Sequence, residues 1–385
     1  MEHLLNPRIK SIEISGIRTF FNMVADYENM ISLTIGQPDF ETPAHIKNAA
    51  KIAIDQNRTT YTHNAGLLPL RKAATHFLKT RYGLSYSPES EVITTAGASQ
   101  AIDVSLRTIL TEGSEVILPG PVYPGYEPII KLCGATPIHV DTTNTEFKMT
   151  RSLIENALTE RTKCIILPSP SNPTGVAMSE EDLADIADLL KNKDVFLLSD
   201  EIYSELNFSG THTSIAQFKG MREKTIVING LSKSHAMTGW RIGFLFAPVN
   251  ICKHMLKVHQ YNVSCASSIS QYAALEALES GLEDPIEMRK EYLVRMNYVY
   301  DRLVEMGLSP VKPDGSFYIL PSIKQFGFTS FEFAMKLAKE GNLAVVPGSA
   351  FSDYGEGYVR ISFAYNLDIL KEGMDRFERF LDTIR

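Results

Sequence analysis

Cysteine is scarce in this chain, and its few copies are widely spaced. Four cysteines occur in 385 residues, and none belongs to a C-x-x-C pair. A zinc site or a disulfide framework usually requires closely spaced cysteines, so the sequence predicts reduced thiols and no metal site. The sequence also lacks an apolar run of membrane-spanning length, and its first residues lack the basic start and apolar core of a signal peptide. We therefore expect a cytoplasmic protein with no membrane partner.

An excess of basic residues is also missing. The chain has 38 Lys and Arg against 45 Asp and Glu, a formal net charge of −7. Since nucleic-acid binders normally display a concentrated basic face, no nucleic-acid partner is expected, and a small-molecule partner is favoured. The chain is also longer than a single hydrophobic core usually serves, so two subdomains are expected.

Short apolar runs alternate with longer helical patterns over the middle of the chain. Such alternation predicts an α/β fold in which helices cover a mainly parallel sheet. The runs that predict strands are residues 91–96, 115–118, 164–167, 195–198, 225–228 and 242–246. After about residue 315, strand-like runs separated by helical stretches predict a smaller α+β subdomain.

Polar residues directly follow several of these runs, where ligands bind in an open α/β sheet. Gly97-Ala-Ser-Gln100 precedes a helical pattern and so offers free N–H groups to a phosphate, although such junctions are about as often ordinary tight turns. The loop Ser169–Gly175 is a proline-rich turn that can present the Asn172 amide, and the next run delivers Asp200 and Tyr203 to the same edge.

The most specific stretch follows the fifth run and contains Lys233. A lysine placed after a buried strand, within a Ser/Gly-rich loop, can approach the chemistry of a neutral amine, whereas most lysines are solvated surface charges. Arg241 lies eight positions later and offers a donor fork suited to a phosphate dianion. His235 has no partner in the sequence and is given no catalytic role.

These motifs resemble, in order and spacing, the fold type I aminotransferases of classes I and II, which depend on pyridoxal 5′-phosphate. The resemblance is carried by residues 35–40, 61–66, 97–100, 121–124, 172–175, 200–203, 232–243 and 358–362, and it covers nearly the whole chain. It implies a large cofactor-binding domain over residues 46–285 with a mainly parallel sheet of the seven-stranded type. Residues 1–45 would form an N-terminal arm that joins a small C-terminal domain, residues 286–385.

The resemblance also implies the catalytic residues. Lys233 would form a Schiff base with the cofactor aldehyde and then move the proton between substrate Cα and cofactor C4′. Asp200 would pair with the pyridine nitrogen and keep it protonated. Arg360 would grip the substrate α-carboxylate by a two-pronged hydrogen bond, with Gly36 and Asn172 also at the substrate.

Further cofactor contacts follow from the same resemblance. Asn172 and Tyr203 would hydrogen-bond the phenolic oxygen of the ring, and Tyr123 would stack on the ring face. The phosphate would be held by Ala98, Ser99, Ser232 and Arg241. Tyr61 resembles a tyrosine that reaches the phosphate from the neighbouring subunit, which implies a homodimer with composite sites. One departure is Gly230, where many relatives carry a serine that also contacts the phosphate.

We therefore expect an aminotransferase that exchanges an amino group between an amino acid and a 2-oxo acid by a ping-pong mechanism, with glutamate and 2-oxoglutarate as one pair. The similarity points to the bacterial branch with aspartate-type and N-acetyl-diaminopimelate aminotransferases, and we favour the second. Residues near Ile17-Arg18 and Tyr261-Asn262 are expected to set specificity.

Other functions remain as alternatives. A carbon–sulfur β-lyase would use the same lysine and aspartate, but Met237–Arg241 resembles the aminotransferase form of the loop. A regulatory domain is disfavoured because no basic helix-turn-helix segment precedes the family-like region. A dinucleotide-dependent dehydrogenase is disfavoured because no strand is followed by G-x-G-x-x-G.

Overall fold

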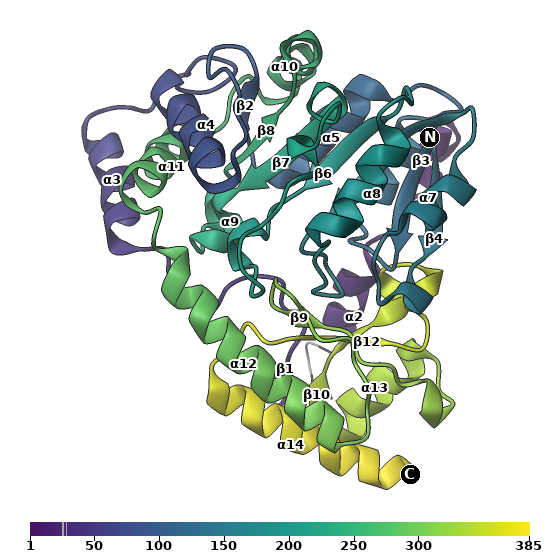
Figure 1. Cartoon of the computed structure of the whole chain (residues 1–385). Coiled ribbons are helices and arrows are strands. Elements are labelled where there is room, and N and C mark those ends of the chain that lie inside the picture. Colours follow the sequence, from purple (N-terminus) through teal and green to yellow (C-terminus); the bar gives the residue numbers. More distant parts are fainter. Residues whose placement is uncertain (25–26, 28) are drawn as a thin grey trace.

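The computed structural model describes residues 1–24, 27 and 29–385 of the chain. Within these residues a seven-stranded sheet forms the centre of the molecule, in the spatial order β2-β8-β7-β6-β5-β3-β4 (Figure 1). Its strands are β2 (Val92–Thr95), β3 (Glu115–Gly120), β4 (Thr136–Asp141), β5 (Thr162–Pro168), β6 (Phe196–Asp200), β7 (Thr225–Gly230) and β8 (Gly243–Phe246). Neighbouring strands are parallel except where β8 pairs with β2 and β7. The expected α/β class with a mainly parallel sheet is confirmed.

All six apolar runs that predicted strands are strands, and β4 is an additional one. It lies at the edge of the sheet, and most of its residues are only partly buried. Pro137 and His139 interrupt its apolar character. An edge strand with one solvent-facing side tolerates such residues, so the continuous apolar run that marks a central strand is missing.

Helices cover both faces of the sheet, because successive residues of a strand point to opposite sides. Ile166 and Leu198 pack with α5, α6 and α10 on one face. Ile165 and Leu197 pack with α7 and α8 on the other face. Nearer to β2, the same face is covered by α3, α4 and α11. The helices are α3 (Ala44–Asp55), α4 (Leu68–Tyr82), α5 (Ala98–Ile109), α6 (Tyr126–Leu132), α7 (Arg151–Ala157), α8 (Glu180–Leu190), α9 (Leu231–Ser234), α10 (Val249–Val263) and α11 (Ser268–Ser280).

Two helices show how local sequence sets their ends and their buried faces. The Ser179 hydroxyl accepts a hydrogen bond from the Asp182 amide and the Asp182 carboxylate accepts one from the Ser179 amide, so α8 begins with a capping box. In α14 (Leu367–Ile384) the stripe Leu370, Met374, Phe377 and Leu381 is buried. Among the helices of the described residues, none combines the length and the apolar character needed to cross a membrane.

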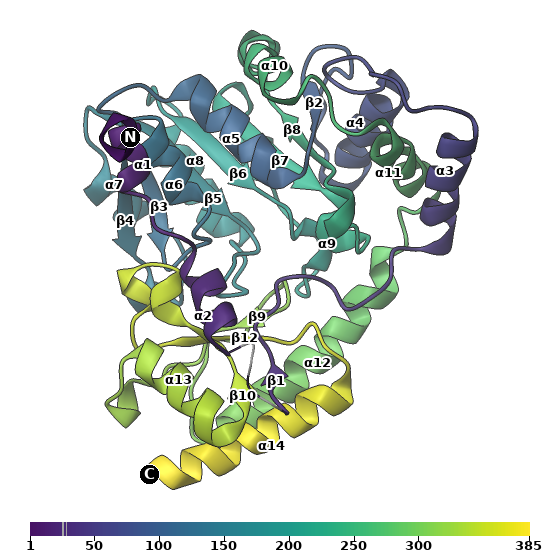
Figure 2. The ribbon, with the colours of Figure 1, turned by 180° about the vertical axis from the view of Figure 1, so that it is seen from behind.

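The long helix α12 (Pro285–Glu305) leads from the seven-stranded sheet to a second, smaller group of elements (Figures 1 and 2). This group has a three-stranded antiparallel sheet in the order β11-β12-β9 and one large apolar core. Its elements are β9 (Tyr318–Ile319), α13 (Ser330–Gly341), β10 (Leu343–Ala344), β11 (Val346–Pro347), β12 (Val359–Ser362) and α14. The boundaries expected at residues 45 and 285 stay a prediction.

The N-terminal segment joins both groups. Strand β1 (Ile31–Ser32) pairs in parallel with β10, and Phe20 of α2 (Gly16–Val24) lies in the core of the smaller group. These elements contact the C-terminal part of the chain, whereas in α1 (Pro7–Lys10) Arg8 donates to the carbonyl of Leu132 at the end of α6. This arrangement brings the segment that follows β1 to the edge of the seven-stranded sheet. The assignment of residues 1–45 to an arm that joins the small domain stays a prediction.

Candidate active site

A cavity of about 380 Å³ lies at the carboxyl ends of the parallel strands and gathers the predicted site residues. Every one of them lines it except Tyr61. They come from the N-terminal segment, the central sheet and the smaller C-terminal group, and they are Gly36, Ala98, Ser99, Tyr123, Asn172, Asp200, Tyr203, Ser232, Lys233, Arg241 and Arg360. The convergence of parallel strand ends explains why residues far apart in sequence meet here.

Lys233 lies in α9, the single helical turn that directly follows β7. Its Nζ donates a hydrogen bond of 2.6 Å to the carbonyl of Gly36 and lies 5.8 Å from the centre of the Tyr203 ring. Burial lowers the pKa of Lys233 to about 8, and the cations Arg360 and Arg241 act in the same direction, while Asp200 opposes them. Near neutral pH a far larger fraction of this amine is therefore uncharged, and able to act as a nucleophile or a base, than in a solvated lysine.

Asp200 is the last residue of β6, and its carboxylate is buried at the floor of the cavity. Its Oδ2 accepts a hydrogen bond of 2.6 Å from the Tyr126 hydroxyl, and its Oδ1 accepts one of 3.3 Å from the Ile202 amide. Burial raises the pKa of Asp200, and these hydrogen bonds lower it in part. Such a carboxylate is suited to pair with a protonated ring nitrogen.

Tyr126 was not predicted as a site residue. It lies three positions after Tyr123, in the first turn of α6, and the two rings make an edge-to-face contact with their centres 5.4 Å apart. Tyr123 precedes α6, so helical spacing does not link the two residues, and only a second tyrosine close to Tyr123 was available as a signal. The hydroxyl of Tyr126 orients the Asp200 carboxylate from the side opposite Ile202.

The turn after β2 and the loop after α9 form a cradle of amides and a guanidinium. Gly97 has φ +84°, and α5 begins at Ala98 with its first amides free. A Cβ on Gly97 would lie 2.7 Å from Arg241 Nη2, and a Cβ on Gly243 would lie 2.7 Å from the Ala98 amide nitrogen. Glycine is therefore required at both positions for this close approach, which brings a helix N-terminus and a guanidinium to one point and suits a phosphate.

Arg360 reaches the cavity from β12 and is buried. Its Nη1 donates to Asn172 Oδ1 at 3.0 Å, and its Nη2 donates to the carbonyl of Thr34 at 2.7 Å. Its guanidinium carbon lies 4.3 Å from the centre of the Tyr318 ring, a contact that was not predicted. The acceptors it has among the described residues are neutral and its Nε has no hydrogen-bond partner there, so an anionic ligand would complete its coordination.

Tyr61 lies away from this cavity, in the loop between α3 and α4. Its side chain is 87% exposed and lines a separate hollow together with Arg58 and Tyr272. Of the residues expected to set specificity, Ile17 lines the cavity, whereas Tyr261 is 88% exposed on α10 and does not.

A larger chamber of about 1040 Å³ adjoins the cavity and shares Ile17, Gly36 and Tyr123 with it. Its wall includes α2 and the segment that precedes it, and Arg18 is among the side chains that line it. A ligand held by Arg360 and Lys233 can therefore extend toward α2.

The sequence and the fold are similar to those of known aminotransferases. A family model described as Aminotransferase class I and II matches residues 28–377. A protein of Bacillus subtilis (strain 168), named a probable N-acetyl-LL-diaminopimelate aminotransferase, is 64% identical over 381 residues, which cover 99% of this chain and 96% of that protein. The crystal structure of an aromatic aminotransferase from Pyrococcus horikoshii OT3 is 43% identical, with a TM-score of 0.90 and 95% and 99% of the two chains covered. An aspartate aminotransferase from Thermus thermophilus with maleate is 34% identical, with a TM-score of 0.93 and coverage of 98% and 99%.

The lowered pKa of Lys233 can be measured in protein freed of bound small molecules. The rate of acetylation of Lys233, followed by mass spectrometry, should rise with pH and level off above about pH 8, because only the neutral amine reacts. Replacing Arg360 by Met removes a nearby positive charge, so it should move this transition to higher pH. The exposed Lys253 in the same sample is the reference, and a Lys233 profile that matches it would show that the cavity does not perturb the amine.

Proposed function

The chain belongs to the class I and II aminotransferases, and from this premise we propose that it transfers an amino group between N-acetyl-LL-2,6-diaminopimelate and a 2-oxo acid. The expected partner pair is glutamate and 2-oxoglutarate. The chain is a fold type I enzyme, and members of this family use pyridoxal 5′-phosphate as cofactor. The observation that carries the substrate proposal is the chamber beyond the cavity, on the side of Arg18.

The donor groups of the cavity fit this cofactor. The Gly97–Arg241 cradle suits its phosphate, the buried Asp200 suits its ring nitrogen, and the amine of Lys233 suits its aldehyde. When bound, the cofactor withdraws electrons from the bonds at the substrate Cα. We assign Ala98, Ser99, Ser232 and Arg241 to the phosphate, since all four line the same end of the cavity.

The remaining residues hold and move protons around the reacting carbon. Lys233 would hold the cofactor through its Nζ, and the same amine would take the proton from substrate Cα and return it. Asp200 would stabilise a positive charge on the ring nitrogen, with Tyr126 holding its carboxylate in place. Tyr203, whose hydroxyl lies 3.3 Å from that of Tyr318, would hydrogen-bond the phenolic oxygen of the ring, and Tyr123 would lie against the ring face.

Arg360 orients the substrate. Its guanidinium is fixed by Asn172, by the Thr34 carbonyl and by the Tyr318 ring, so a carboxylate can bind without reordering a flexible side chain. With its carboxylate on Arg360, the substrate presents its Cα–H to Lys233. Gly36 lies beside both groups, where its small size leaves room: a Cβ there would lie 2.7 Å from the Tyr318 hydroxyl.

An N-acyl diaminopimelate differs from glutamate in the part of the molecule that lies far from the reacting carbon. That part carries a second carboxylate and an acetamide, and it needs space that the cavity of about 380 Å³ does not offer beside the cofactor. The adjoining chamber supplies this space, and the Arg18 guanidinium supplies a positive charge for the distal carboxylate. The similarity to the Bacillus subtilis protein supports the same substrate class.

Visible absorption spectra test this function directly. N-acetyl-LL-2,6-diaminopimelate should bleach the cofactor band of the purified enzyme, and 2-oxoglutarate should restore it. Lys233→Ala is the matched control, in which both changes should be lost because the base is missing. Bleaching by aspartate without a response to the acylated donor would replace the proposed substrate by aspartate. Release of pyruvate and ammonia from a β-substituted amino acid would indicate a β-lyase instead.

Removal of the Arg360 guanidinium tests the carboxylate clamp. Arg360→Ala should lower kcat/KM for the amino donor about a hundredfold, because a buried charge-assisted contact is lost. Arg360→Lys keeps the charge without the planar donor fork and should recover only part of the loss. The cofactor band should persist in both variants. If Arg360→Ala leaves the preference for amino acids over simple amines unchanged, Arg360 does not bind the carboxylate.

We further propose a homodimer in which Tyr61 completes the phosphate site of the partner subunit. Asn64 donates to the carbonyl of Ser264, which places the Tyr61 loop beside the end of α10, where Tyr261 is also exposed. Exposed large side chains grouped in this way favour contact with another protein surface. Neither tyrosine lines the cavity of its own chain, as expected if Tyr61 acts across the interface.

Mixing two inactive variants tests the shared site. Lys233→Ala lacks the base, and Tyr61→Ala should lose activity when cofactor is limiting. A mixed dimer regains one complete site, so random exchange of subunits should restore about a quarter of wild-type activity. The separate variants at the same total concentration are the control. Absence of any gain on mixing, or a monomer by light scattering, would contradict the composite site.

A cytoplasmic location is also proposed. All four cysteines are free thiols, and burial raises the pKa of Cys252 to about 12. Unpaired cysteines are typical of proteins in reducing compartments. Cys133 and Cys265, which are only partly buried, would be vulnerable to oxidation elsewhere.

A further inference from the structure

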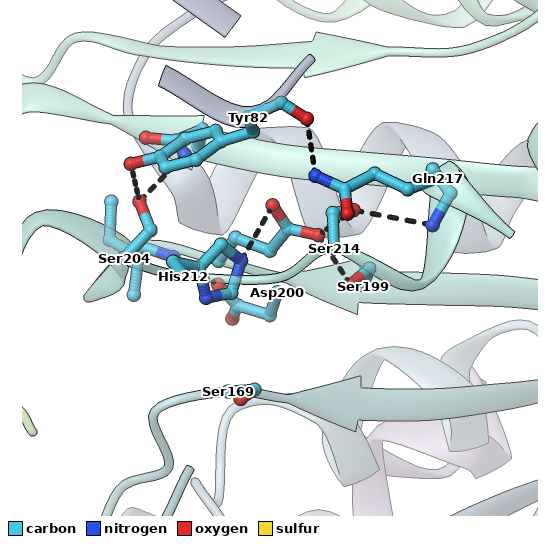
Figure 3. A network of polar contacts seen from close by, with 12 residues as sticks. Tyr82, Ser169, Ser199, Asp200, Ser204, His212, Ser214 and Gln217 are labelled. Atoms are coloured by element: carbon cyan, nitrogen blue, oxygen red, sulfur yellow. Dashed lines mark hydrogen bonds and ion pairs between the residues drawn. The ribbon is translucent and has the colours of Figure 1, made fainter. Parts of the chain in front are cut away.

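A buried cluster of polar side chains lies behind Asp200, outside the cavity (Figure 3). Its centre is Glu201, which follows Asp200 and is fully buried. Glu201 Oε1 accepts hydrogen bonds from the hydroxyls of Ser199, at 2.8 Å, and Ser214, at 2.5 Å. His212 Nε2 lies 3.0 Å from Glu201 Oε2, although neither atom has a partner in hydrogen-bond geometry among the described residues, and both side chains are buried. Because side chains alternate along a strand, Glu201 and Ser199 lie on the face opposite to Asp200.

The cluster extends to the strand that carries the lysine loop. Tyr82, the last residue of α4, makes an edge-to-face contact with His212, with ring centres 5.2 Å apart. Its hydroxyl donates a hydrogen bond of 2.8 Å to the Ser204 hydroxyl. The same hydroxyl accepts a hydrogen bond of 3.1 Å from Asn229 Nδ2 near the end of β7. Asn229 lies four residues before Lys233. One connected set of contacts therefore links the turn after β6 to the start of the lysine loop.

A purely structural role does not readily explain this composition. A carboxylate that is removed from water is stabilised only by close partners, and apolar side chains of similar volume commonly pack such a space at no loss of stability. Glu201 also has an electrostatic effect on the site, since burial raises the pKa of Asp200 and the negative charge of Glu201 acts in the same direction. Glu205 also borders the cluster: its Oε1 accepts a hydrogen bond from the Tyr82 hydroxyl, and its Oε2 lies 3.8 Å from Arg81 Nε.

We propose that Glu201 and His212 form a positioning pair, which holds the turn Asp200–Tyr203 in a fixed relation to the Lys233 loop. Asp200 and Tyr203 flank Glu201 and face the cavity, so anchoring the Glu201 side chain from behind fixes the direction of both. The pair does not touch the substrate or the cofactor. The proposal rests on the assignment of Asp200 and Tyr203 to the cofactor ring and is independent of which amino donor is used.

Glu201→Gln keeps the size of the side chain and removes its charge, so it tests the pair most directly. The dissociation constant of pyridoxal 5′-phosphate, measured by fluorescence titration of the cofactor-free protein, should rise about tenfold, as is usual when residues behind a ligand are altered. The midpoint of the pH titration of the visible band should also shift, in the same direction as in Asp200→Asn but by less. Both substitutions would weaken the contact between Asp200 and the ring nitrogen.

Glu115→Gln is the matched control. Glu115 is a buried glutamate too, and its partner is Arg161. It begins β3, so it lies at the amino ends of the parallel strands, whereas the cavity lies at their carboxyl ends. Both variants should lower the melting temperature of the cofactor-free protein, and only Glu201→Gln should alter the dissociation constant and the titration. If Glu201→Gln changes the melting temperature alone, the pair is structural and the proposal is wrong.

A milder variant keeps the test decisive if Glu201→Gln does not fold. Ser214→Ala removes one hydrogen bond to Glu201, and it should raise the cofactor dissociation constant about threefold. Thr159→Ala, which removes the hydroxyl that donates to Glu115, should leave that constant unchanged. An unchanged constant in Ser214→Ala would overturn the proposal. If Asp200→Asn itself leaves binding and titration at wild-type values, the assignment of Asp200 fails, which is a different outcome from failure at Glu201 alone.

Discussion

The electrostatic imbalance of the cavity is the constraint on which the rest of the site depends. Among the described residues, Lys233, Arg241 and Arg360 line it together with a single carboxylate, Asp200. Burial is the main cause that lowers the pKa of Lys233 to about 8, and repulsion by the two neighbouring cations acts in the same direction. The two guanidiniums stay charged. The cavity is therefore complementary to a ligand that brings negative charge, as a phosphate and a carboxylate do together, and burial and repulsion together prepare the amine for reaction.

The fold maintains this arrangement by drawing on three separate parts of the chain. Asp200 ends β6 and Lys233 lies in the helical turn after the neighbouring parallel strand β7, whereas Arg360 comes from β12 of the smaller group. Arg360 is bonded to Asn172 on the sheet side and to the Thr34 carbonyl on the N-terminal side, so one guanidinium connects all three parts. The position of Arg360 relative to Lys233 is therefore set jointly by the sheet, the N-terminal segment and the smaller group.

The sequence was most informative where a residue is buried within a central strand or follows one directly. The six apolar runs became strands because helices bury both of their faces, which holds even for β2 at one edge of the sheet, and Asp200, Lys233 and Asn172 were found because they stand just after such runs. Strand β4 was missed because most of its residues, at the other edge, are only partly buried, so its sequence is not continuously apolar. Tyr126, Tyr318 and His212 were missed for another reason: each acts through a contact that only tertiary structure creates, with Asp200, Arg360 and Glu201 respectively. Residues that orient other residues carry no local pattern, so they are the last part of a site that sequence reasoning can find.

Substrate choice must depend on residues other than those assigned to the cofactor and the α-carboxylate. The groups that hold the cofactor and the α-carboxylate act on parts common to every amino acid, so they cannot distinguish one donor from another. The discriminating contacts lie where the side chain of the donor extends, which is toward the chamber bounded by α2. Because α2 packs on the smaller group through Phe20, and Ile17 of the same helix lines the cavity, the wall of this chamber and Arg360 belong to one packed unit. Under the proposed function, a donor with a charged distal end would contact this unit at both of its ends, whereas a short donor would contact it only through Arg360.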